Sequence, residues 1–168
     1  DYVFDGKSVE PYREGDPVSP LGVYGNTKWE GELAVLEKGP DNSLIVRTAW
    51  VYGHGGRNFV DAILEKGNLG EPLKVVTDQK GSPTFSDDLA DALNALLSIQ
   101  ANGTVHVTGH GACTWYEFAK EVLSTSGLEV GLLEETTSAT LGRRAPRPSY
   151  SVLDDEIFRS VTGSVMRA

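Results

Sequence analysis

Short apolar runs alternate along this chain with longer stretches of helical character, and this alternation constrains the fold most strongly. A continuous apolar run, which is typical of a buried parallel strand, occurs at residues 44–46, and further short strands are expected at residues 73–76 and 104–107. Helix signals separate or follow them, at residues 20–38, 58–66 and 85–99, from Thr114 onward and from about Asp154. Residues 2–4 are also expected to be the end of a buried strand. The pattern predicts an α/β fold with a parallel sheet.

Three features of composition exclude broad classes of function. A net charge of −9, without a sustained stripe of Lys or Arg, argues against a nucleic-acid partner. No apolar run approaches the ~20 residues that cross a bilayer, so no membrane association is expected. A single cysteine, Cys113, excludes an internal disulfide and fits a reducing compartment, which predicts a cytoplasmic protein. His106 and His110 bracket what reads as a strand end and a turn rather than a helix, so no metal site is expected.

Two Tyr/Lys pairs with a spacing of four residues are candidates for proton chemistry. Tyr24 and Lys28 lie near the predicted start of a helix, whose Ser19-Pro20 reads as N-cap and first position. An ammonium group one turn away and a helix amino terminus both favour a phenolate, as carbonyl–alcohol chemistry requires. Tyr116 and Lys120 have the same spacing but flank an apolar stripe, which favours packing. Spacing and context alone leave catalysis by Tyr24 open.

The sequence contains no glycine-rich loop that could seat a dinucleotide pyrophosphate. Neither G-x-G-x-x-G, G-x-x-G-x-x-G nor a P-loop occurs, and the glycines near position 55 fit none of these motifs. The chain also opens on Asp1, inside an apparent strand. We therefore expect a carboxy-terminal fragment whose main cofactor-binding half lies upstream of Asp1.

Several sequence words resemble those of the extended short-chain dehydrogenase/reductase superfamily. They are Asp-Tyr-Val-Phe-Asp-Gly at 1–6, Pro-Leu-Gly-Val-Tyr-Gly-x-x-Lys at 20–28 and Glu-Gly-Glu at 30–32. Further words are similar to the dTDP-4-dehydrorhamnose reductase family: Arg-Thr-Ala-Trp-Val-Tyr-Gly at 47–53, Asn-Phe-Val at 58–60, Val-Val-Thr-Asp-Gln-Lys-Gly-Ser-Pro-Thr at 75–84, Trp-Tyr-Glu-Phe-Ala at 115–119 and the closing Arg144…Arg147-Pro148…Leu153-Asp154. The resemblance covers nearly the whole chain in the family's order.

The resemblance implies a reductase that converts dTDP-4-dehydro-L-rhamnose to dTDP-L-rhamnose with NADPH or NADH. Residues 1–70 would complete a partial Rossmann-like domain, and residues 71–168 would form most of a small, interleaved α/β substrate-binding portion. Tyr24 would protonate the carbonyl oxygen, and Lys28 would hold the cofactor ribose and tune Tyr24. The Ser or Thr that completes this group would stand immediately before Asp1.

The same resemblance implies a set of substrate contacts. Asp1 and Tyr2 would lie at the substrate side, Trp50 would line the sugar pocket, and the 78–84 and 143–147 segments would face the nucleotide. Arg144 and Arg147 are also physical candidates, because a guanidinium group matches phosphate oxygens at two points. A solvated basic loop is the alternative for these two arginines.

Three classes of function remain open at this stage. The parent protein is the reductase, another epimerase or dehydratase acting on nucleotide sugars, or a non-catalytic regulatory relative. The chain alone is expected to be inactive, since the cofactor seat is absent. An exposed sheet edge would favour self-association, so a homo-oligomer is a further expectation.

Overall fold

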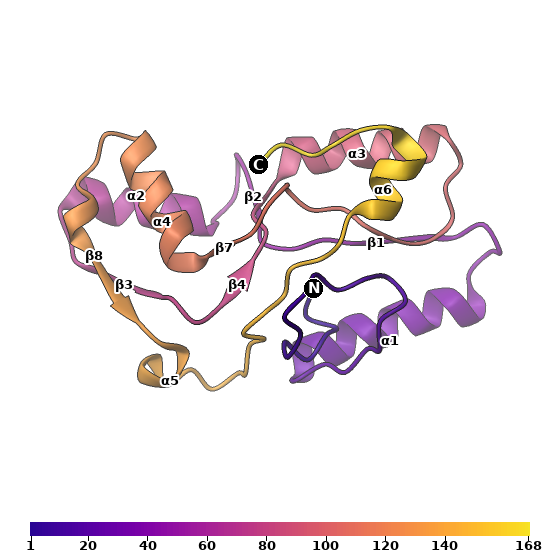
Figure 1. The fold of residues 1–168 in the computed structure, drawn as a ribbon, viewed down its shortest axis with the longest axis horizontal. Helices are drawn as coiled ribbons and strands as arrows, with labels where there is room; N and C mark the ends of the chain where they lie inside the picture. Colours follow the sequence, from indigo (N-terminus) through magenta and orange to yellow (C-terminus); the bar gives the residue numbers. More distant parts are fainter.

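The computed structural model describes all residues 1–168, and its centre is a parallel pair of strands. β1 (Leu44–Arg47) pairs with β6 (Gly103–His106) in a register that runs from Leu44–Gly103 to Arg47–His106. The α3 helix (Ser86–Ser98) and the α6 helix (Glu156–Thr162) cover one face, where Leu96, Val105 and Phe158 form a buried cluster. α1 (Val23–Lys38) lies on the other side of β1 (Figure 1). The predicted α/β architecture with parallel pairing is confirmed.

A second group of elements lies beside the first. β3 (Leu73–Val76) pairs in parallel with β8 (Leu133–Thr136), and α2 (Phe59–Leu69) and α4 (Trp115–Thr125) pack on this pair. Figure 1 shows this group at the left and the β1–β6 group at the right. Sequence order is interleaved between the groups, because α2 belongs to one and α3 to the other. The division at residue 70 stays a prediction.

Very short strands join the two groups. β2 (Val51–Tyr52) pairs in parallel with β5 (Thr84–Phe85), and β4 (Lys80–Gly81) pairs antiparallel with β7 (Cys113–Thr114). A 3₁₀ turn, η1 (Val130–Leu132), leads into β8, and α5 (Ser138–Leu141) follows it. The pairings bring residues around 50, 81 and 114 together between the groups.

The predicted strand at residues 2–4 is wrong, because this segment forms a turn. The Phe4 N–H donates to the Asp1 carbonyl oxygen at 3.2 Å, which closes the turn. Val3 and Phe4 are nevertheless buried, and the Phe4 ring stacks on Tyr12 with centroids 4.3 Å apart. A short buried apolar run fits a strand or a buried turn equally well, so sequence could not separate them.

The predicted start of α1 at Ser19-Pro20 is also wrong. The helix begins at Val23 after Gly22, whereas the Ser19 N–H donates to the carbonyl oxygen of Val3. Gly25 then packs directly against the Tyr2 carbonyl, at a distance that leaves no room for a β-carbon. The close contact between Gly25 and the Tyr2 carbonyl therefore fixes the start of α1 against the turn at Tyr2, and with it the position of Tyr24.

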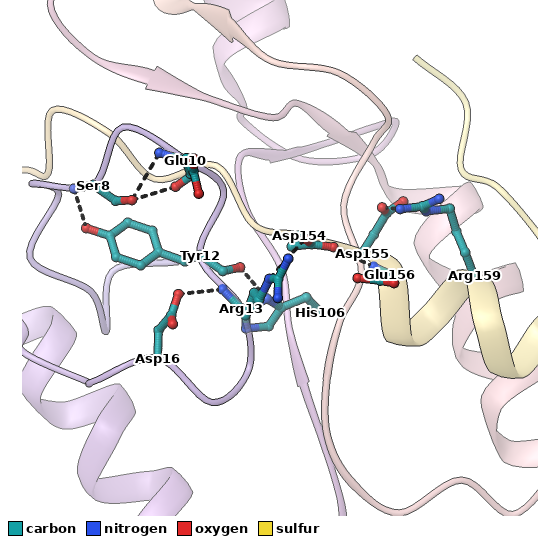
Figure 2. Close-up of polar contacts among 10 residues, drawn as sticks. All are labelled: Ser8, Glu10, Tyr12, Arg13, Asp16, His106, Asp154, Asp155, Glu156 and Arg159. Carbon is teal, nitrogen blue, oxygen red and sulfur yellow. Dashed lines mark hydrogen bonds and ion pairs between the residues drawn. The ribbon is translucent and has the colours of Figure 1, made fainter.

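The loop of residues 5–19 is fastened to the sheet by polar contacts. Figure 2 shows the Tyr12 carbonyl oxygen accepting from His106 Nδ1 at 3.1 Å and Arg13 pairing with Asp154. Beneath the loop, the guanidinium group of Arg47 pairs with Glu32 at 2.7 Å and donates to the Glu14 carbonyl oxygen. This buried network joins α1, β1 and β6.

Two predicted helix starts are confirmed in detail. The Asn58 side chain accepts from the Asp61 N–H at the start of α2, and Thr114 and Glu117 form a reciprocal capping box at α4. α2 runs past Gly67 to Leu69, and the following Gly70 adopts the left-handed backbone that glycine favours at a helix end. α6 begins at Glu156 rather than at Asp154. None of the helices combines the length and apolarity needed to cross a bilayer.

Candidate active site

A cavity of about 650 Å³ opens between the start of α1 and the segment that precedes α6. Tyr2, Tyr24, Arg144 and Arg147 line it, together with the small and apolar residues at 21–23, Gly25 and 145, 146 and 148. Figure 1 shows the segment after α5 passing beside the amino-terminal end of α1. The structure therefore brings together four residues that the sequence predicts for the site.

Tyr24 and Lys28 project from the first turns of α1. Lys28 Nζ lies 5.4 Å from the centroid of the Tyr24 ring, and Lys28 makes no ion pair. The Tyr2 ring meets the Tyr24 ring edge-on, with centroids 5.4 Å apart and planes at 90°. Tyr24 is 60% exposed, so its hydroxyl group remains available to a ligand in the cavity.

Tyr2 and the arginines form the electrostatic part of the cavity. Burial raises the pKa of Tyr2 above its ordinary value, while the nearby positive charge of Arg147 acts in the opposite direction. The charge of Arg143 acts on the Tyr2 pKa in the same direction as Arg147. Burial, together with the charge of Arg147, lowers the pKa of Arg143 itself. Two like charges at one cavity wall repel each other, and a bound anion would relieve that repulsion.

Contacts on both sides fix the arginine segment in place. Pro148 packs against Gly6, whose positive φ of 73° and close approach exclude a side chain. The Ser149 hydroxyl group donates to the Gly6 carbonyl oxygen at 2.9 Å, and the Ser149 carbonyl oxygen accepts from the Lys80 N–H at 2.8 Å. Arg147 is therefore attached to a short anchored segment rather than to a free loop.

A second cavity, of about 430 Å³, shares Arg147 with the first. Its walls are apolar and aromatic, from α2, β3 and Trp115, and its cationic groups are Lys66, Lys74, Arg143 and Arg147. Sequence reasoning did not indicate Lys66 or Lys74, and it included Arg143 only within the 143–147 segment, whereas it named Arg144 and Arg147 individually. The run of arginines was the available signal, but it did not show which of them face which cavity.

Two predicted substrate residues lie elsewhere. The Asp1 nitrogen donates to the Thr48 carbonyl oxygen at 3.1 Å, and Asp1 Oδ2 is buried without a hydrogen-bond partner. Trp50 stacks face to face on Trp115, with centroids 3.6 Å apart. Neither Asp1 nor Trp50 lines either cavity. Their assignment to the substrate stays a prediction.

The 78–84 segment holds the start of α5 through hydrogen bonds to Ser138. Asp78 accepts from the Ser138 N–H at 2.9 Å, and the Gln79 amide donates to the Ser138 hydroxyl group at 2.6 Å. These contacts hold the start of α5, and no residue of the segment lines either cavity. That the segment faces a nucleotide is a prediction that these contacts leave open.

The second Tyr/Lys pair behaves as the packing interpretation predicts. Tyr116 is half-buried and packs against the cluster around Leu123, whereas Lys120 is exposed. Neither residue lines the two cavities described above. No group of three or more His, Cys, Asp or Glu side chains has an arrangement that could hold a metal ion.

The exposed hydroxyl group of Tyr24 and the unpaired ammonium group of Lys28 fit one part of a reduced nicotinamide cofactor. Both face outward on the same turns of α1, where Lys28 can donate to ribose hydroxyl groups. The described residues include no glycine-rich loop for a pyrophosphate. Tyr24 and Lys28 thus place a proton donor and a cation side by side on α1.

Comparison with known proteins gives one family. The family model described as RmlD substrate binding domain matches residues 1–168. The chain is 48% identical over 153 residues to the spore coat polysaccharide biosynthesis protein SpsK of Bacillus subtilis, covering 91% of this chain and 53% of SpsK. It is 45% identical over 165 residues to dTDP-4-dehydrorhamnose reductase of Streptomyces griseus, covering 95% and 54%.

A solved structure agrees with these matches. The crystal structure of dTDP-4-dehydrorhamnose reductase from Bacillus anthracis in complex with NADP has a TM-score of 0.94 at 36% identity, covering 99% of this chain and 59% of that one. The chain spans about half the length of the curated relatives it matches.

Proposed function

The chain belongs to the RmlD substrate-binding domain family, and on this basis we propose that the protein containing it is a dTDP-4-dehydrorhamnose reductase. It would reduce dTDP-4-dehydro-L-rhamnose to dTDP-L-rhamnose with NADPH or NADH. The observation that carries the proposal is the shared cavity, in which Tyr24 and two arginines line one space of about 650 Å³. Besides the hydride that the cofactor would supply, reduction of a nucleotide-linked ketone needs a proton donor and an anchor for the diphosphate, and the cavity offers both.

Each residue has a defined task in this proposal. Bound reduced nicotinamide supplies a hydride to the carbonyl carbon. The Tyr24 hydroxyl group donates its proton to the carbonyl oxygen, and the Lys28 ammonium group, 5.4 Å from the ring centroid, stabilises the negative charge left on Tyr24. The edge-on Tyr2 ring limits how far the Tyr24 ring can turn.

The diphosphate of the substrate would bind at Arg147, the residue common to both cavities. Arg144 faces the first cavity and Arg143 the second, so the three arginines surround the junction. A diphosphate there would place the sugar beside Tyr24 and the thymidine in the apolar second cavity. Its negative charge would also offset the repulsion between Arg143 and Arg147.

The test is turnover of dTDP-4-dehydro-L-rhamnose by the full-length protein, followed by consumption of NADPH or NADH. Tyr24→Phe should lower kcat about 10²- to 10⁴-fold, as loss of a general acid does. Tyr116→Phe is the matched control, because it has the same spacing to a lysine but packs away from the cavity. Near-normal turnover by Tyr24→Phe would contradict the assigned acid.

A second variant tests the anion anchor. Arg147→Ala should raise KM for the nucleotide sugar roughly 10- to 100-fold, the effect of losing a charge-assisted hydrogen bond. Arg159→Ala is the control, since Arg159 pairs with Asp155 on α6 and lines neither cavity. An unchanged KM in Arg147→Ala would remove Arg147 from the proposal.

The remaining parts of the proposal concern the chain alone and the cell. We expect residues 1–168 by themselves to lack reductase activity and tight NADPH binding, since the described residues hold no pyrophosphate loop. Calorimetric titration with NADPH tests this, and sub-micromolar affinity would contradict it. A cytoplasmic location and a homo-oligomer also belong to the proposal; fractionation and light scattering of the full-length protein test them.

A further inference from the structure

α1 contacts the rest of the molecule through one narrow face. Of its 16 residues only Gly25 is buried, and Trp29 and Glu32, four and seven positions later, are half-buried. Positions with this spacing share one side of a helix. Tyr24 and Lys28 project from an adjoining side, so the rotation and the axial position of α1 decide where their side chains point.

Two of the three contacts on this face leave α1 some freedom to move. Trp29 packs against the apolar cluster around Tyr12, and apolar packing is non-directional and tolerates small shifts. Gly25 touches the Tyr2 carbonyl, which limits how closely the start of the helix approaches but does not hold its later turns. The third contact, made by Glu32, is polar and therefore directional.

Arg47 binds Glu32 with a defined geometry. Its Nη2 donates to Glu32 Oε2 at 2.7 Å, and its Nε donates to Oε1 at 3.0 Å and to Oε2 at 3.1 Å. The two side chains are only 6% and 11% exposed, so water competes little for them. A planar guanidinium group and a carboxylate that meet at several points fix orientation as well as distance. The pair therefore sets the position of α1 against Arg47, the last residue of β1.

Arg47 is in turn held by the other segments around the site. Its Nη1 donates to the Glu14 carbonyl oxygen at 3.3 Å and lies 3.4 Å from His106 Nε2 on β6. Its Cζ lies 5.3 Å from the centroid of the Phe4 ring, and Phe4 closes the turn that carries Tyr2 of the cavity wall. One buried guanidinium group thus connects α1 with β1, β6 and that turn.

We propose that Arg47 and Glu32 are positioning residues, whose ion pair fixes α1 so that the Tyr24 hydroxyl group and the Lys28 ammonium group face the carbonyl of the nucleotide sugar. This inference rests on the proposed function. Neither partner lines the two cavities, so the pair acts through α1 and touches no reacting atom. Its loss should slow proton transfer and leave substrate binding at Arg147, which has its own anchored segment, intact.

The decisive variant removes the ion pair and keeps the fold. In the full-length protein, Arg47→Met with Glu32→Leu replaces two buried charges by apolar side chains, an exchange that is often neutral or stabilising. Its urea midpoint should therefore lie close to that of wild type. Because a misplacement of about 1 Å at a reacting group costs about 100-fold in rate, kcat for dTDP-4-dehydro-L-rhamnose should fall roughly 10- to 100-fold, with KM within about twofold. A crystal structure of the double variant should show α1 displaced against β1.

Glu32→Gln should give the opposite combination of properties. The glutamine oxygen can replace Oε2, which accepts from both Nε and Nη2 of Arg47, so α1 keeps its place. The urea midpoint should fall, since the Arg47 charge is buried without a counter-ion, while kcat stays within about threefold of wild type. Asp155→Leu with Arg159→Met is the matched control, because it removes an ion pair on α6 and should retain both kcat and KM.

A merely structural pair predicts that kcat follows stability across these variants. A wild-type kcat in the double variant, or kcat values that rank as the urea midpoints do, would overturn the inference.

Failure of the proposed function gives a different result. If the wild-type protein neither turns over nor binds dTDP-sugars, the proposed function is wrong, and the role of the pair in proton transfer falls with it. If the wild-type protein is active and the double variant keeps its kcat, the inference about Arg47 and Glu32 is wrong by itself.

Discussion

Lowering the pH below 6.5 should destabilise this fold through one buried histidine. His106 has no exposed surface, and its ring lies between the Tyr12 carbonyl oxygen and the Arg47 guanidinium group. Nδ1 donates to Tyr12, and Nε2 accepts from Arg47, so these partners select the neutral ring. Burial, reinforced by the positive charge of Arg47, lowers the pKa of His106 from 6.5 to about 4.

The size of the effect follows from linkage. Because the folded pKa lies below the unfolded value, the contribution of His106 is fully present above pH 6.5 and is lost as the pH falls through 4. A difference of about 2.5 pKa units, at about 1.4 kcal/mol per unit, corresponds to about 3 kcal/mol of unfolding free energy. This is a substantial part of the roughly 5–15 kcal/mol by which ordinary domains are stable.

Urea unfolding of wild type and of His106→Asn between pH 7.5 and about 4 measures this contribution. Asparagine retains a donor toward the Tyr12 carbonyl oxygen but does not titrate. The two proteins therefore differ in one titrating group, and the pH dependence contributed by all other groups cancels when their unfolding free energies are subtracted. The wild-type advantage should shrink by about 3 kcal/mol across this interval. Parallel pH profiles, or a nuclear magnetic resonance titration of His106 with a midpoint near 6.5, would refute the reasoning.

Three further tests, of packing, charge and capping, use urea unfolding as the measurement. Gly25→Ala should cost about 1–3 kcal/mol by collision with the Tyr2 carbonyl, whereas Gly31→Ala, on the open side of the same helix, should stabilise by about 0.5–1 kcal/mol. Arg47→Met should cost about 3–5 kcal/mol by leaving Glu32 buried and unpaired, and a second change, Glu32→Leu, should recover much of that loss. Thr114→Ala should cost about 1 kcal/mol through loss of the α4 cap.

Elements with a strong local signal could be predicted from the sequence. The helices α2, α3 and α4 carry apolar stripes, and the caps of α2 at Asn58 and of α4 at Thr114 form as their residue types indicate. β8 was missed because Glu134 and Glu135 are exposed between two buried residues, and only pairing with β3 makes this stretch a strand. The two-residue strands have no periodicity to detect.

The candidate site was predictable in its residue types and less so in its arrangement. Tyr24, Tyr2 and Arg147 meet in one cavity although they lie up to 145 positions apart, and the resemblance alone indicated that they belong together. The Arg47–Glu32 pair had no signal at all, because it depends on how α1 crosses β1. Tertiary contacts of this kind carry no local pattern.

The two Tyr/Lys pairs show what separates a candidate catalytic pair from an ordinary one. Spacing is identical in both, and each lies on an α-helix. The Tyr116 ring packs against the core around Leu123. Tyr24, in contrast, is 60% exposed and lines a cavity that Arg144 and Arg147 also line. A catalytic acid needs a substrate held beside it. The residues that would hold the substrate, Arg144 and Arg147, lie about 120 positions away in the sequence. The pair is therefore informative only together with the anion anchor, so Tyr24→Phe and Arg147→Ala should divide cleanly between kcat and KM.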